Sequence, residues 1–167
     1  MAIAQKLSGL FTALIDLIDG ASLEAMKADR EENTPAVAAA AGRIQRGQKP
    51  AILLFLFASD AEETTRDGAG HPTRLHTTID IVVLRHLGGE DSARQPSTVT
   101  RLGGELDDLA DAIFDLLQAV DSPREDLSLA SGTTMSPEGQ QPVGDIGLYD
   151  WTGRRVRVRF TRPVQSL

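Results

Sequence analysis

Three aspartates in the second half of the chain have the spacing that metal binding or acid–base chemistry would use. Asp108, Asp111 and Asp115 are separated by three and four residues, which places their carboxylates on one face of a helix. Such a group could hold a divalent cation or act as paired carboxylates. A simple solvated acidic face is the alternative. Because like charges at these spacings cost roughly 0.2–0.5 kcal/mol per pair, a basic surface from the same or a neighbouring subunit would stabilise them.

The C-terminal region supplies such a basic pattern. Arg155, Arg157 and Arg159 alternate with apolar residues, and a period of two predicts a strand with one cationic face. The alternative is a polar edge strand on which charge blocks unwanted strand pairing. No Lys or Arg lies between Leu102 and Pro123, so we expect negative and positive surfaces on different elements. Charge separated in this way favours head-to-tail attraction between copies, although the arginines and the acidic helix could also pair within one subunit.

The histidines do not form a metal site in the predicted strands. His76 and His86 share a strand face but lie about 33 Å apart at ~3.3 Å per residue, too far for one metal ion. His71 falls before the expected start of that strand and has an odd spacing to His76, so surface histidines are expected.

Other catalytic motifs are missing from the sequence. There is no phosphate-loop motif and no Gly-x-Ser-x-Gly elbow. Gly103 and Gly104 precede a predicted helix start, where backbone amides could bind an anion, but Glu105 and Asp107 would repel it. We therefore expect no enzyme activity and no catalytic residue, cofactor or metal.

Composition limits the class of protein. With 167 residues and 41% hydrophobic content, the chain is expected to form one domain, residues 1–167. The net charge of -7 argues against a general nucleic-acid or anionic-membrane binder, although a local arginine patch remains possible. We expect no membrane and no sequence-specific nucleic acid among its partners. The longest apolar run, Ala51–Ala58, is far shorter than the about 20 residues of a membrane-spanning helix. There is no cysteine, which excludes disulfides and thiolate sites.

Hydrophobic periodicity predicts the elements that position these residues. An amphipathic helix is expected at Ala2–Ile18, a polar helix at Ser22–Lys27 and a short helix or connector at Thr34–Gly42. A buried strand at Ala51–Phe57 and a long strand at Arg74–Leu87 are expected to pair antiparallel.

Between these strands lies a charged loop, Ser59–Thr73, which is long enough to reach a neighbouring subunit. It carries Asp60, Glu62, Glu63 and Arg66.

The second half repeats this order of helix and strands. A linker, Gly88–Thr100, leads into an amphipathic helix at Leu102–Val120, and Arg124–Val143 is expected to be irregular. A hairpin is expected to join Gly144–Tyr149 to Arg154–Arg162, with Gly153 in a left-handed turn position. The predicted fold is α+β, with a mainly antiparallel sheet of about four strands, two amphipathic helices packed on one face, and long polar loops.

This combination resembles the tail terminator proteins of contractile and long-tailed bacteriophages and related tail-like particles. The resemblance is carried by the order of elements across most of the chain: the N-terminal helix, the strand Pro50–Phe57, a polar loop, the strand His76–Leu87, a Gly-Gly-Glu turn, the helix Gly104–Val120, a Ser/Gly/Pro-rich segment and the hairpin Asp145–Arg162. The long, alanine-rich segment Ser22–Gly47 departs from simpler members.

The resemblance implies a structural virion protein, assembled in the bacterial host. It would form a hexameric ring that caps the tail tube, ends its polymerisation and joins the tail to the head-side connector or stopper protein. A contact with the sheath is left open. The candidate interface residues are Asp60, Glu62, Glu63, Arg66, Asp108, Asp111, Asp115, Arg155, Arg157 and Arg159.

Other functions are compatible with the same patterns. A head-tail connector or a tail-tube initiator would share the element order. A small-molecule-binding α+β domain would use the acidic helix and a histidine, and a regulatory adaptor would bind a protein through the terminal hairpin.

Overall fold

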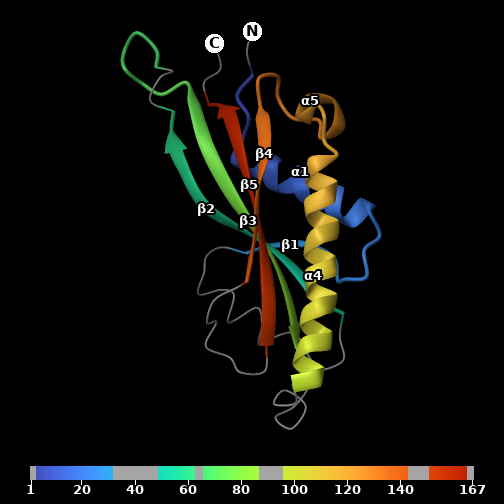
Figure 1. The fold of residues 1–167 in the computed structure, drawn as a ribbon. Coiled ribbons are helices and arrows are strands. Elements are labelled where there is room, and N and C mark those ends of the chain that lie inside the picture. The colour runs from blue at the N-terminus through green and yellow to red at the C-terminus, as the bar shows by residue number, and fades with distance from the viewer. Residues whose placement is uncertain (1–2, 32–48, 63–65, 87–95, 143–150, 165–167) are drawn as a thin grey trace.

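The computed structural model describes residues 3–31, 49–62, 66–86, 96–142 and 151–164 (Figure 1). The elements in these ranges are α1 (Leu7–Gly20), β1 (Asp29–Glu31), β2 (Ala51–Ala61), β3 (Arg74–His86), α4 (Pro96–Gln118), α5 (Pro123–Asp126), β4 (Thr134–Pro142) and β5 (Trp151–Pro163).

The strands form one five-stranded sheet in the order β1-β2-β3-β5-β4. β1 is parallel to β2, and every other neighbouring pair is antiparallel. The predicted α+β class with a mainly antiparallel sheet is therefore confirmed. The short parallel strand β1 was not expected.

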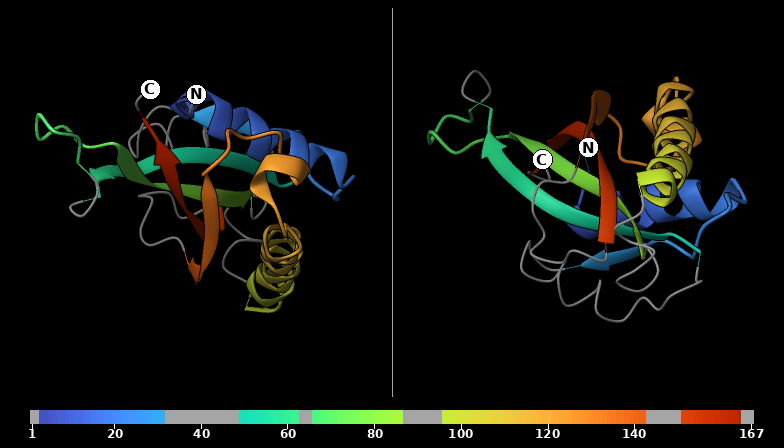
Figure 2. Two further views of the ribbon diagram at one scale, coloured as in Figure 1. Left: turned by 90° about the horizontal axis from the view of Figure 1, so that it is seen from above. Right: turned by 60° about the horizontal axis from the view of Figure 1, so that its bottom comes forward.

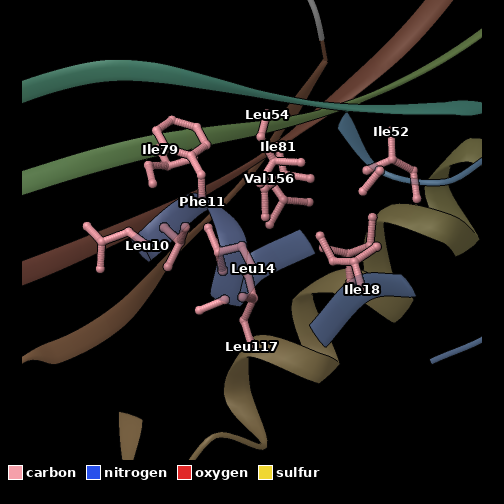
Figure 3. Packing of buried hydrophobic residues seen from close by; sticks show 14 of the residues in the cluster. Leu10, Phe11, Leu14, Ile18, Ile52, Leu54, Ile79, Ile81, Leu117 and Val156 are labelled. Carbon is pink, nitrogen blue, oxygen red and sulfur yellow. The ribbon is translucent and has the colours of Figure 1, made fainter. Parts of the chain in front are cut away.

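Helices α1 and α4 close one hydrophobic core over a single face of the sheet (Figure 2). Apolar residues three and four apart on each helix meet alternate residues of the three central strands. Figure 3 shows side chains of α1 and α4 directed towards those of β2, β3 and β5. The fully buried members, each worth ~1.5–3 kcal/mol, include Leu10, Leu14, Ile18, Leu54, Ile79, Ile81, Leu106, Ile113, Val156, Val158 and Phe160.

The β2–β3 hairpin confirms the predicted antiparallel pairing. Pairing runs from Ala51↔Leu84 to Ala61↔Leu75, with a bulge between Leu56 and Ala58. β2 is longer than predicted, so the connection begins at Glu62. The connecting loop projects beyond the end of the sheet, on the side away from α4 (Figures 1 and 2).

The helix predicted at Ser22–Lys27 is wrong. Ser22 has a left-handed backbone with φ 52° instead of capping a helix. The amide of Met26 donates to Pro50 O at 2.8 Å, and the amide of Ala28 donates to Asp19 Oδ1 at 2.8 Å. These bonds hold the segment between the end of α1 and the residue before β2, and the segment leads into β1. Tertiary hydrogen bonds therefore override a weak local helix signal.

Helix α4 begins earlier than predicted, at Pro96 within the expected linker. Proline is favoured in the first turn of a helix because it has no N–H to leave unpaired there. Gly103 and Gly104 consequently lie inside the helix, and their amides are not free to bind an anion.

The segment predicted to be irregular, Arg124–Val143, contains the single-turn helix α5 and the edge strand β4. β4 was not predicted because Pro137, Gly139 and Pro142 interrupt the alternation of apolar and polar residues that is typical of a strand. It nevertheless pairs with β5, through a bulge between Pro137 and Gly139. Gly153 is also not in a turn: it pairs with Leu84 inside β5 and has no left-handed φ.

Several predictions lie outside the described residues. The helix or connector at Thr34–Gly42 and the strand at Gly144–Tyr149 are among them. Within the described ranges, no helix is long and apolar enough to cross a membrane.

Candidate interaction surfaces

Alternate side chains of strand β5 lie in two different environments. Val156, Val158 and Phe160 are fully buried against the helices. Arg155, Arg157 and Arg159 point to the opposite face of the sheet, as the period of two predicted. Burial of the apolar set fixes the register, because a slip by one residue would turn the arginines into the core.

A buried carboxylate anchors two of these arginines. Asp80 of β3 lies opposite Arg157 in the ladder and is 6% exposed. Arg157 donates from Nε to Asp80 Oδ1 at 2.8 Å and from Nη2 to Oδ2 at 3.1 Å, and Arg155 Nη1 lies 3.6 Å from the same carboxylate. The hydrogen bond to Asp80 raises the pKa of Arg157 above its ordinary value, although burial acts in the opposite direction. This fork geometry holds the guanidinium in one orientation.

The same guanidinium stacks on an exposed aromatic ring. Phe57 lies at the bulge of β2 and is 58% exposed, and the Arg157 guanidinium carbon is 3.8 Å from its ring centre. Arg159 is the most exposed of the three arginines and reaches Glu138 only at 3.9 Å. We call Phe57, Asp80, Arg155, Arg157 and Arg159 the arginine patch.

Sequence reasoning found the arginines of this patch and missed Phe57 and Asp80. Asp80 is the one acid between Ile79 and Leu84, which was a signal for a paired buried charge. Phe57 was assigned to a strand buried on both faces, but the bulge after Leu56 leaves its ring at the surface.

Further along the same face, the sheet is not a free surface. Leu53, Phe55, Val82 and Leu84 all belong to it, and each is buried. This part of the face is therefore not open to solvent, whereas Asp60, near the other end of the same face, is exposed.

The acidic residues of α4 fall into two groups. Glu105 contacts Arg85 at 2.8 Å and Arg101 at 3.5 Å, and Asp107 accepts from Arg154 Nε at 2.6 Å. These two acids are neutralised within the chain.

The next three acids, Asp108, Asp111 and Asp115, are exposed and differ from that pair. Asp111 accepts from the neutral amide of Gln140, at 2.8 Å. Within the part of the chain that the structure describes, Asp108 and Asp115 have no cationic partner. We call these three residues the acidic ridge.

The structure separates the two charged surfaces that the sequence suggested as a pair. The acidic ridge is on a helix that covers one face of the sheet, whereas Arg155, Arg157 and Arg159 lie on the other. They consequently do not pair with each other within one chain. Arg154, one residue earlier in β5, is the arginine that reaches α4, and it passes so close to Gly103 that an added Cβ there would lie 3.1 Å from Arg154 Nη2.

The tip of the charged loop is held by hydrogen bonds within the loop. The Asp67 carboxylate accepts from the amides of Ala69 and His71, both at 2.9 Å, and Arg66 Nη1 donates to Gly70 O at 2.9 Å. Gly70 has φ 83°, a conformation that glycine adopts without strain.

At the base of this loop the charges pair across the hairpin. Glu62 lies 3.6 Å from Arg74 Nε and 3.9 Å from His76 Nε2, while Asp60 is exposed opposite His76 in the ladder. Glu63 lies outside the described residues.

The histidines do not converge. His71 Nδ1 lies 3.7 Å from Asp67, and His76 Nδ1 is 2.9 Å from Thr161 Oγ1. Among the residues that the structure describes, no three histidine, aspartate or glutamate side chains are placed to hold a metal ion.

A buried arginine at the other end of β5 was not predicted. Arg162 is 8% exposed and lies on the helix-covered face. It donates to Gln5 O at 2.7 Å and to Thr77 Oγ1 at 2.9 Å, with Ser59 Oγ at 3.4 Å. Burial lowers the pKa of Arg162, whose hydrogen-bond acceptors are a carbonyl and two hydroxyls. The arginine ties the segment before α1 to the end of the sheet.

Comparison of the chain with family models and with curated proteins found no match.

Proposed function

We propose that this protein is a structural subunit that assembles with copies of itself into a ring on a phage or phage-like tail tube. In this role it ends tube polymerisation and presents a surface to the head-side connector or stopper protein. The proposal makes it a non-catalytic component of the virion, with the tube protein and its own copies as its main partners.

One observation carries this proposal. The acidic ridge and the arginine patch bear opposite charge and lie on opposite sides of one sheet, so within the described part of the chain neither surface pairs with the other. Contacts between different surfaces of identical subunits join them head to tail, and such contacts close into rings when the rotation permits. The order of elements resembling tail terminators supports the choice of a tail ring among possible assemblies.

Electron microscopy of tail tubes grown with and without the protein tests this function. We expect rings at tube ends and shorter tubes as the ratio of this protein to tube protein rises. Sedimentation of the mixture should recover the protein with the tubes, since a template can gather subunits that remain monomeric in free solution. A protein that neither binds tube ends nor changes tube length would refute the proposal.

The same experiment separates the related assembly roles. A tail-tube initiator would increase the number of tubes instead of arresting their growth. A head-tail connector would bind head-side proteins without limiting tube length.

A further inference from the structure

The arginine patch has the features of a contact surface for a negatively charged partner. Among the residues that the structure describes, its three arginines form ion pairs with two carboxylates, those of Asp80 and Glu138. The guanidinium of Arg157 is already fixed by Asp80, so little side-chain entropy is lost when a partner binds over it. Phe57 adds exposed aromatic surface of the kind enriched at the centres of protein interfaces.

The acidic ridge supplies the matching charge. It carries three exposed carboxylates and no cation, and its neighbours Glu105 and Asp107 are already paired with arginines. A partner that brings cations to Asp108 and Asp115 would also remove their repulsion with Asp111.

We infer that the arginine patch of one copy binds the acidic ridge of the next copy, and that this is the repeating contact of the assembly. The inference rests on the proposed ring, for which it names the two contacting surfaces. Because the surfaces lie on opposite faces of the sheet, a two-fold dimer cannot satisfy both of them at once. The contact instead leaves one unfilled surface at each end of every growing chain of subunits, until a ring closes.

The edges of the sheet are poor alternatives for this contact. β4 forms one edge, and Pro137, Pro142 and a bulge interrupt the backbone groups that a further strand would pair with. β1 forms the other edge of the described sheet and has only three residues. Association through faces is therefore favoured over extension of the sheet.

Charge reversal on each surface provides the test. Arg159→Glu lowers the net charge of the patch from +2 to 0, and from +1 to -1 when the neighbouring Glu138 is counted. The Arg159 side chain is 44% exposed and forms only a long ion pair, so the fold should tolerate the change. Asp108→Arg with Asp115→Arg makes the ridge net positive at two exposed positions. Since facing like charges cost several kcal/mol, each variant alone should bind tube ends at least ~10-fold more weakly.

An equimolar mixture of the two variants should restore binding. The reversed patch of one variant faces the reversed ridge of the other, and the unchanged patch faces the unchanged ridge. The restored ring would alternate the two variants and would therefore contain an even number of subunits. Native mass spectrometry of the mixture measures this composition directly.

Control variants reverse charge elsewhere. Asp16→Arg in α1 and Arg124→Glu in α5 alter exposed residues outside both surfaces and should leave tube binding unchanged.

Phe57→Ala tests the arginine patch without any change of charge. We expect ~10-fold weaker tube binding for this variant. Ile3→Ala, at a residue that is 72% exposed and lies outside both surfaces, should have no effect.

The outcomes distinguish the inference from the proposed function. If folded single variants bind tubes like the wild type, or if the mixture stays inactive, the assignment of surfaces is wrong and the ring proposal stands. If the wild type itself does not bind tube ends, both fail. Circular dichroism of each variant verifies folding, and Phe57→Ala decides the assignment should a charge-reversed chain not fold.

Discussion

Arg157 and Arg162 lie five residues apart in the same strand and are held in opposite ways. Arg157 is partly exposed, forms a two-bond fork with a carboxylate and has a raised pKa. Arg162 is buried, donates to a carbonyl and two hydroxyls, and has a lowered pKa. Odd spacing places them on opposite faces of the sheet. The comparison shows that the neighbouring strands, more than the residue type, decide whether an arginine forms a surface or fastens the chain.

The two arginines also differ in their roles: Arg162 contributes to stability, whereas Arg157 belongs to a surface proposed for recognition. Arg162 holds Gln5, whose side-chain oxygen accepts from the amide of Ala130 at 2.6 Å, so one buried cation connects the N-terminal segment, the sheet and the loop before β4. Arg157 instead keeps its charge at the surface, beside an exposed ring.

Removing the carboxylate beneath Arg157 should produce the largest effect. Asp80→Ala leaves two partly buried guanidiniums without their anion, which we expect to lower the free energy of unfolding by about 2–3 kcal/mol. Urea denaturation followed by circular dichroism measures this. Glu138→Ala, which removes the distant partner of Arg159, should cost under about 1 kcal/mol. Equal losses in the two variants would show that Asp80 is not a special anchor.

Replacing the buried arginine should have the next largest effect. Arg162→Met removes the donors that satisfy Gln5 O and Thr77 Oγ1, so a loss of about 1–3 kcal/mol is expected. Amide exchange should accelerate first at Gln5 and Ala130, whose N–H groups depend on the docked segment. A more stable variant would mean that the cost of burying the charge outweighs its hydrogen bonds.

Replacing the exposed Phe57 ring should affect recognition more than folding, in contrast to the replacement of Arg162. Phe57→Ala removes an exposed cation–π contact and should lower the free energy of unfolding by only about 0.5–1 kcal/mol. Thermal denaturation of the variant beside Ile3→Ala measures the difference. A loss of several kcal/mol would place Phe57 in the core and not in the arginine patch.

The smallest expected effect has the opposite sign. Asp115→Asn removes the repulsion with Asp111 one helical turn away and should stabilise the isolated subunit by roughly 0.2–0.5 kcal/mol. The gain should vanish at about 1 M salt, where the Debye length is ~3 Å. Destabilisation at low salt would mean that Asp115 has a cationic partner within its own chain.

Prediction from sequence succeeded where the hydrophobic period was long and unbroken. The amphipathic helix α1, the long strand β3 and the two different faces of β5 were all predicted, because burial of one side of an element requires apolar residues at a fixed period. Prediction failed for β4, whose prolines and glycine conceal its pairing, and for the segment after α1, whose amides are satisfied by β2 and by Asp19.

The candidate surfaces divide in the same way. Arg155, Arg157 and Arg159 and the three aspartates of the ridge were found from spacing alone. Their separation onto opposite faces of the sheet was not, since it depends on which face the helices cover. Glu105 and Asp107 likewise resembled the unpaired acids until Arg85 and Arg154 were located beside them.

By itself, therefore, the sequence determined that one strand would carry arginines on a single face and that one helix would carry three aspartates on a single face, because both follow from local geometry. Only the tertiary structure decided that Asp80 and Phe57 complete the arginine patch, that Arg162 is buried, and that patch and ridge cannot meet within one chain. Those outcomes depend on contacts between residues far apart in sequence, such as Asp80 with Arg157, and no local period encodes them.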